Sequence, residues 1–257
     1  MGSSEGDKPL RRIAASFEEL EAVAKQQQPG PGAMEVGAFA RACSNVSVLF
    51  GCLGIAFKFA EMDYVAKASP PSLTRTLLST AAAAAPAPRG FVGIGASIEL
   101  VCCLGLRNCL LACVVVVDDL LEASKSISKL PEMVELDIQK GTVRQAGSHT
   151  RNLLRVKRGI DMVKILFEQI LVTEGNSLRD AASKAYAQVF APHHGWAIRK
   201  AVAAGMYALP SKSQLLKKLN EDENSAKVQM QNFVRASGPV ILYVEDLFTS
   251  RNLGMDW

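Results

Sequence analysis

Residues 144–174 of the chain read RQAGSHTRNLLRVKRGIDMVKILFEQILVTE, and this stretch decides the fold class. Its apolar residues recur at the spacing of one helix face, at Leu153, Val156, Ile160, Val163, Phe167 and Ile170. This period is typical of an amphipathic helix that packs one side against a core. Because Gly175 and Asn176 follow directly, we expect a long helix that ends at about Glu174.

The same rhythm continues on both sides of this segment, and a sustained strand alternation is found nowhere. We expect further helices over residues 16–27, 36–67, 118–129, 133–140, 183–190, 192–208, 213–220, 224–236 and 239–249. The pattern Ser16-Phe-Glu-Glu19 would cap the first of these helices. Aromatic residues make up only 6% of the chain, which also favours helices over a β-sandwich. The sequence therefore predicts an all-α protein.

The bulk composition is that of an ordinary globular protein with a substantial core. The chain has 257 residues, of which 49% are hydrophobic and 21% charged. A formal net charge of +4 is too modest to indicate a nucleic-acid partner, but it suffices for contact with an anionic membrane surface.

The beginning of the chain and its cysteines bear on where the protein works. The first twelve residues contain no apolar stretch of a secretory signal, and Gly6 breaks the myristoylation pattern that Gly2 would begin. The six cysteines, at positions 43, 52, 102, 103, 109 and 113, show no Cys-x-x-Cys spacing. We expect reduced thiols, no metal site and a cytoplasmic protein.

Two arginines, Arg151 and Arg155, lie four residues apart within the predicted long helix. Residues with this spacing share a helix face, and two guanidinium groups side by side are unfavourable without an anion. A forked planar cation suits a pair of phosphate oxygens, so the doublet is a candidate phosphate clamp. A solvated basic helix face is the alternative that this pair alone leaves open. Lys157 and Arg158 are expected on the wet face, or at lipid phosphates during docking.

Four blocks of sequence, in order along the chain, resemble the glycolipid transfer protein family. They are Glu61-Met-Asp63-Tyr-Val-Ala-Lys67, Thr150-Arg151-Asn-Leu-Leu-Arg155-Val-Lys-Arg-Gly159, Phe190-Ala-Pro-His-His194-Gly-Trp196 and Met206-Tyr-Ala-Leu-Pro210. Within the family the match is to the plant accelerated-cell-death branch, which resembles ceramide-1-phosphate transfer proteins. The resemblance covers about residues 36–67 and 117–257.

The resemblance implies a two-layer helical sandwich that encloses the hydrocarbon chains of a lipid and holds its headgroup at a polar surface site. Asp63 would then accept hydrogen bonds from the sphingoid amide and hydroxyl, and His194 would donate to the acyl-amide carbonyl. Lys67, Arg151 and Arg155 would hold the phosphate. Family members that carry sugar headgroups have a tryptophan where this chain has Arg155. No catalytic residue, metal ligand or cofactor is implied.

The chemistry of these residues agrees with that assignment. Three cations and one carboxylate give a local charge near +2, which matches the charge of about −1.5 to −2 on a phosphate monoester at pH 7. An amide that is removed from water needs both an acceptor and a donor, and Asp63 with a neutral His194 supplies them. Taken singly, each residue could equally be an exposed ion pair or an ordinary helix histidine.

One stretch departs from the family pattern. The segment Val117-Asp-Asp-Leu120 would follow Lys67 directly in the family, but about fifty residues intervene. We therefore expect an N-terminal segment over 1–35 with a short helix, and a single domain over 36–257 that an insertion interrupts at about 68–116. We expect the insertion to loop out with a local helix over 91–117, because closure entropy rises slowly with loop length. A translated non-coding stretch that impairs folding, or a membrane span, are the alternatives.

The sequence thus predicts a non-enzymatic carrier of a phosphorylated sphingolipid, ceramide-1-phosphate in the first place, that touches membranes peripherally and transiently. The alternative is a lipid-responsive regulator of cell death that acts through protein partners. A phosphoryl-transfer enzyme and an integral membrane protein are further alternatives.

Overall fold

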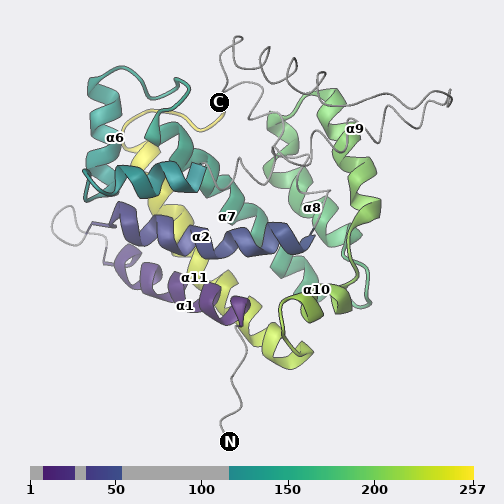
Figure 1. Cartoon of the computed structure of the whole chain (residues 1–257). Coiled ribbons are helices and arrows are strands. Elements are labelled where there is room, and N and C mark those ends of the chain that lie inside the picture. Colours follow the sequence, from purple (N-terminus) through teal and green to yellow (C-terminus); the bar gives the residue numbers. More distant parts are fainter. Residues whose placement is uncertain (1–7, 27–32, 54–115) are drawn as a thin grey trace, which may run out of the picture.

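The computed structural model describes residues 8–26, 33–53 and 116–257, and the regular structure in these ranges is helical (Figure 1). The elements are α1 (Pro9–Ala24), α2 (Val36–Leu53), α6 (Leu130–Gln139), α7 (His149–Val172), α8 (Arg179–Val189), η1 (Ala191–His193), α9 (Trp196–Gly205), η2 (Met206–Ala208), α10 (Lys212–Lys218) and α11 (Glu223–Thr249). Residues 116–123 form a further helical segment ahead of α6. The prediction of an all-α fold is confirmed.

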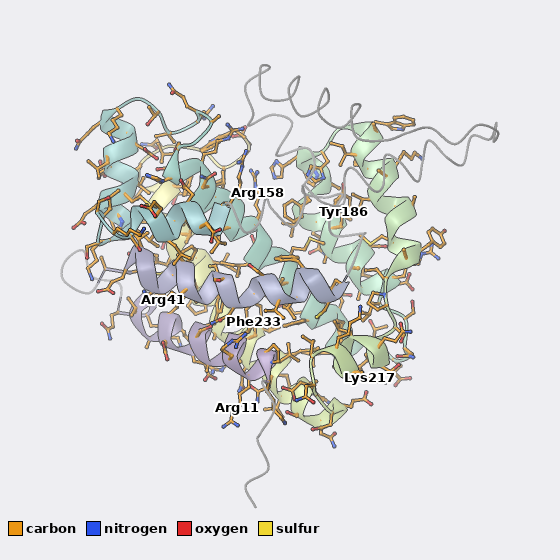
Figure 2. The ribbon with its side chains drawn as sticks, in the orientation of Figure 1. Arg11, Arg41, Arg158, Tyr186, Lys217 and Phe233 are labelled. Atoms are coloured by element: carbon orange, nitrogen blue, oxygen red, sulfur yellow. The ribbon has the colours of Figure 1, made fainter. Side chains whose placement is uncertain are left out.

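The core forms where α11 packs against both α1 and α7. Phe233 of α11 lies near the middle of the molecule (Figure 2). Its ring meets Phe17 of α1 edge-on at 4.8 Å and Phe167 of α7 edge-on at 5.5 Å. All three rings are almost fully buried. Aromatic contacts of this geometry add to the stabilisation that burial alone provides, so α11 joins the N-terminal helix to the long helix α7.

Charged pairs support the same two contacts. Arg235 of α11 bonds Glu18 and Glu21 of α1, and Glu245 of α11 bonds Lys157 of α7 at 2.5 Å. Helix α7 also packs against α8, and α2 packs against α1. Helix α7 is therefore in contact with both α11 and α8.

The prediction for α7 is confirmed in its apolar face and adjusted at its start. All six residues of the predicted inner face are buried. The helix begins at His149 rather than Arg144, because Gly147, at a φ of 86°, turns the chain just before the N-cap. The hydroxyl of Ser148 then accepts a hydrogen bond from the amide of Arg151 at 3.1 Å.

The predicted capping box of the first helix is wrong. Helix α1 begins at Pro9, where the missing amide hydrogen costs nothing. Ser16 lies in the middle of α1, and its hydroxyl donates to the carbonyl of Ile13 at 2.9 Å. The apolar face also starts earlier than expected, with Leu10 and Ile13 buried.

The predicted break at Pro239 is also wrong, because α11 runs through this residue without interruption. A proline inside a helix removes one hydrogen bond. Val240 and Val244, one and five residues after Pro239, are buried and keep the helix packed. By contrast, the helix expected over 192–208 is divided into η1, α9 and η2, and the one expected over 118–129 ends at residue 123.

Helix α2 starts at Val36, as predicted, and is described up to Leu53. By length and composition it could cross a membrane, with a mean hydropathy of 1.4 over 18 residues. Its apolar face is accounted for by the core, where Phe39, Val46 and Leu49 are buried. The rest of the predicted helix and nearly all of the predicted insertion lie outside the described residues, so the domain boundaries stay a prediction.

Candidate functional site

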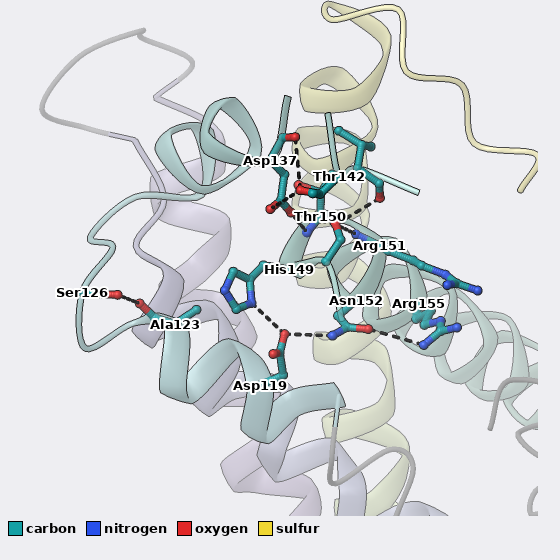
Figure 3. A network of polar contacts seen from close by, with 12 residues as sticks. Asp119, Ala123, Ser126, Asp137, Thr142, His149, Thr150, Arg151, Asn152 and Arg155 are labelled. Carbon is teal, nitrogen blue, oxygen red and sulfur yellow. Dashed lines mark hydrogen bonds and ion pairs between the residues drawn. The ribbon is translucent and has the colours of Figure 1, made fainter. Parts of the chain in front are cut away.

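A buried carboxylate fixes the first turn of α7. One oxygen of Asp137 accepts the hydroxyl of Ser148 at 2.7 Å and the amide of Thr150 at 2.8 Å, and the other accepts the hydroxyl of Thr142 at 3.3 Å (Figure 3). Burial raises the pKa of Asp137, but the bonds from Thr150 and Ser148 outweigh it, so the pKa is lowered overall. Charge-assisted bonds to this carboxylate therefore hold the helix that carries the two arginines.

Arg151 and Arg155 lie one turn apart on α7, and their side chains extend to the same side of the helix (Figure 3). Both are half-buried rather than exposed. The prediction that the pair shares a face is confirmed, and the fully solvated basic face does not fit this burial. Two guanidinium groups held together in partial burial favour an anion between or beside them.

Arg155 is connected to a network that the sequence analysis did not identify. One of its guanidinium nitrogens, Nη1, lies 3.4 Å from Oδ1 of Asn152, and Nδ2 of Asn152 lies 2.8 Å from Oδ2 of Asp119 (Figure 3). The same oxygen of Asp119 lies 2.9 Å from Nδ1 of His149. The contact of Asn152 with Arg155 could have been predicted from the sequence, because these residues are three residues apart and therefore lie on one helix face.

His194 is buried at the end of η1, with an exposed fraction of 5%. Its Nδ1 lies 2.9 Å from the hydroxyl of Tyr186, and its ring stacks on Phe190 at 5.7 Å. When a hydroxyl donates to Nδ1, the ring proton of a neutral histidine is on Nε2. This arrangement suits the donor role that the resemblance implies for His194. Tyr186, eight residues earlier on α8, was not predicted from the sequence as a residue of the site.

The segment that carries His194 lies close to α7. Burial and the charge of Arg158 hold the pKa of neighbouring His193 below its ordinary value, against the opposing effect of Asp256. Arg158 is itself buried and donates to the backbone oxygens of Met255 at 2.7 Å and Trp257 at 2.9 Å. The fold thus brings the histidine segment and the arginine helix together.

The expectation that Lys157 and Arg158 lie on a wet or membrane-facing surface is wrong. Lys157 is buried and bonds Asp161 at 2.6 Å as well as Glu245. Burial disfavours the charged amine, but hydrogen bonds from Nζ to Asp161 and Glu245 outweigh it and raise the pKa of Lys157. Both cations are thus buried and bonded to other parts of the protein rather than exposed to solvent.

Two of the five predicted site residues, Asp63 and Lys67, lie outside the described residues. The described part of the candidate site therefore consists of Arg151, Arg155 and His194. Within residues 8–26, 33–53 and 116–257, no group of three or more metal-ligating side chains is placed to hold a metal ion. The described cysteines, Cys43 and Cys52, are free thiols whose pKa is raised by burial.

Comparison with known proteins gives consistent matches. Residues 114–221 match the family model described as Glycolipid transfer protein. The chain is 50% identical to the protein Accelerated cell death 11 of Arabidopsis thaliana, with 100% of both chains covered. It is 30% identical to a Ceramide-1-phosphate transfer protein of Danio rerio over 135 residues, which cover 48% of this chain and 63% of the relative.

Solved structures agree on the fold. The lipid-free Arabidopsis protein aligns with a TM-score of 0.71, covering 95% of this chain and 100% of the relative. A point mutant of it in complex with ceramide-1-phosphate aligns with a TM-score of 0.73, covering 98% and 100%. Human ceramide-1-phosphate transfer protein, at 16% identity, covers 95% and 96% with a TM-score of 0.60. The full-length identity of 50% shows that the chain belongs to the glycolipid transfer protein family.

Proposed function

We propose that this protein binds one ceramide-1-phosphate molecule at a time and carries it between membranes without changing it chemically. The observation that carries the proposal is the arginine pair of α7, half-buried and directed to the same side. Two forked cations can take several oxygens of one phosphate, whereas a sugar headgroup offers no charge for them to neutralise.

The other described site residue supports a sphingolipid rather than a free phosphate. His194 is buried beside Tyr186 and Phe190. A proton on its Nε2 could be donated to the amide carbonyl of a sphingolipid, which needs a donor once it is removed from water. The proposed site also includes Asp63 and Lys67. Crystal structures of the 50% identical Arabidopsis protein contain ceramide-1-phosphate, which supports the same ligand class for this chain.

The hydrocarbon part of such a lipid explains why a carrier is needed. Each CH₂ group transferred to water costs about 0.8 kcal/mol, so a long-chain lipid leaves a bilayer only for another apolar environment. The family to which the chain belongs consists of lipid transfer proteins. We further propose that the protein catalyses no reaction on the bound lipid. Mass spectrometry of the lipid recovered after incubation with the protein would test this.

We also propose that the protein works in the cytoplasm and touches membranes transiently. Trp196 and Tyr207 support a peripheral contact, because their exposed fractions are 69% and 72%. Aromatic rings with a polar tip suit the boundary between water and lipid. The protein should sediment with anionic vesicles and be released from them by a wash at high salt, which would test whether the contact is reversible.

The transfer proposal is tested by following fluorescent lipids between donor and acceptor vesicles. The wild-type protein should move ceramide-1-phosphate faster than galactosylceramide, and equal or faster movement of the sugar lipid would contradict the headgroup assignment. Arg155→Ala should slow ceramide-1-phosphate transfer by about tenfold, the equivalent of one charge-assisted hydrogen bond.

A matched control for that variant is Lys217→Ala. Lys217 is an exposed cation of α10, well away from Arg158 in Figure 2. The control removes the same charge from the molecule and should leave transfer within about twofold of wild type, because exposed charges contribute little. Equal slowing by both variants would assign the effect to net charge rather than to the site.

A second candidate function is that of a lipid-responsive regulator whose partners recognise the loaded state. The name of the Arabidopsis relative, Accelerated cell death 11, favours it. If it is correct, an identified partner should bind the ceramide-1-phosphate-loaded protein differently from the empty one, and Arg151→Glu should remove the difference.

A further inference from the structure

Asn152 connects a carboxylate to a guanidinium, and the chemistry of these two groups fixes the orientation of its amide. Asp119 can only accept a hydrogen bond from Asn152, and Arg155 can only donate one to it. The Nδ2 group of Asn152 must therefore face Asp119, at 2.8 Å, and its Oδ1 must face Arg155, at 3.4 Å. Asn152 is buried, with an exposed fraction of 7%, so little water competes for either contact.

The position of the carboxylate is fixed in turn by a second donor. Oδ2 of Asp119, the oxygen that meets Asn152, also lies 2.9 Å from Nδ1 of His149. His149 and Asn152 both belong to the first turn of α7, whereas Asp119 comes from the helical segment 116–123. Asp119, Asn152 and Arg155 therefore form a chain of contacts that starts outside α7 and ends on a guanidinium group of α7.

We propose that Asp119, acting through Asn152, is a positioning residue for phosphate recognition. It polarises the amide so that Oδ1 of Asn152 holds the Arg155 guanidinium in the orientation that the headgroup needs. This inference rests on the proposed function, because it names a residue that serves the same site. Hydrogen bonds in a chain strengthen one another, and a carboxylate at its far end strengthens the acceptor. A long side chain that is already held in its binding orientation loses less conformational entropy when the ligand binds.

The two arginines differ in this respect. Within the described part of the chain, the side chain of Arg151 makes no comparable contact with a polar side chain, whereas Arg155 is connected to the Asp119 chain. The loss of Asp119 should therefore act on the contribution of Arg155 and leave that of Arg151 unaffected. This difference provides the internal comparison for the test.

The primary test uses three substitutions and two fluorescent lipids with the same chains, ceramide-1-phosphate and ceramide. Asp119→Ala should weaken ceramide-1-phosphate binding by about five- to tenfold and leave ceramide binding within about twofold. Asp119→Asn retains an oxygen that can accept from Asn152, so it should restore most of the affinity. Asp118→Ala removes the same charge from an exposed neighbouring position and should match wild type.

A double-mutant cycle separates positioning from a general effect on the fold. Asp119→Ala should have no further effect on ceramide-1-phosphate binding in the Arg155→Ala background, but its full effect in the Arg151→Ala background. Additive losses in both backgrounds, or an equal loss for ceramide, would overturn the positioning role. If Asp119→Ala does not fold, Asn152→Leu breaks the same connection with little change in volume and is tested by the same cycle.

The wild-type arm tests the proposed function separately. A wild-type protein that does not prefer ceramide-1-phosphate to ceramide would overturn both the headgroup assignment and the positioning role of Asp119. A wild-type preference combined with additive losses in both cycles would overturn only the positioning role of Asp119.

Discussion

The hydroxyl of Tyr186 lies 2.9 Å from Nδ1 of His194, and both side chains are buried. Without this hydroxyl, neutral His194 could carry its proton on Nδ1 and would then lose the donor on Nε2. We expect Tyr186→Phe to lower the affinity for ceramide-1-phosphate by about three- to tenfold, the range of one neutral hydrogen bond. A binding assay with fluorescent ceramide-1-phosphate measures this affinity. Thr249→Val, which removes an exposed hydroxyl at the end of α11, should have no effect on this affinity. Equal losses in the two variants would contradict the assignment.

Lys157 balances two carboxylates where α7 meets α11. Its Nζ lies 2.6 Å from Asp161 and 2.5 Å from Glu245. Lys157→Met would leave these two carboxylates without the amine that bonds both of them, in surroundings where burial already raises the pKa of Asp161. We expect the free energy of unfolding to fall by about 2 to 3 kcal/mol, somewhat below the range for fully buried pairs because both carboxylates are partly exposed.

Urea denaturation of two separate variants, Lys157→Met and Lys164→Met, measures this loss in the free energy of unfolding. Lys164 forms an ordinary i, i+4 pair with Glu168 at 2.7 Å, so its removal should cost less than about 1 kcal/mol. If the two variants lose the same amount, Lys157 contributes no more than a surface pair.

Asp137 should make the fold sensitive to acid. Its pKa is lowered in the folded protein, so its contribution to stability is present above the pKa of an unfolded aspartate, about 3.9. That contribution is lost as the pH falls through the folded pKa. Asp137→Asn should therefore lower the free energy of unfolding by about 2 kcal/mol near pH 7, and the difference from wild type should shrink below about pH 4. Denaturant titrations at several pH values measure it, and a constant difference would contradict the assignment.

The ring of Phe233 on α11 contacts rings of both α1 and α7. Phe233→Ala should lower the free energy of unfolding by about 3 to 5 kcal/mol, because the cavity would face both Phe17 and Phe167. The measurement is again denaturant unfolding. Val228→Ala on the same helix, with an exposed fraction of 51%, should change it by less than about 0.5 kcal/mol.

The long helix and the arginine pair were predictable because both depend on spacing along one segment. The apolar period of α7 and the interval of four between Arg151 and Arg155 needed no knowledge of the rest of the fold. Lys157 and Arg158 were misplaced for the opposite reason. Their partners, Glu245 and the backbone oxygens of Met255 and Trp257, come from the far end of the chain. No local pattern indicates that α7 packs against both α11 and α8.

The residues that support the site could not be predicted either, because their partners are also distant in the sequence. Asp119 and Asn152 are 33 residues apart, and each has an ordinary role on its own helix until the fold joins them. The break at Pro239 was inferred from a local preference that the packing of α11 overrides. Local rules therefore located the cations, and tertiary contacts decided which of them are buried in bonds to the rest of the fold.

Helix α11 carries Arg235, which binds α1, and Glu245, which binds α7. Neither partner helix can detach without exposing apolar surface on this shared element. Slow amide hydrogen exchange in α1 and α7 should accordingly report one opening event of similar free energy, rather than separate fraying of the N-terminal helix. A protein that delivers its cargo at a membrane would then have to open elsewhere.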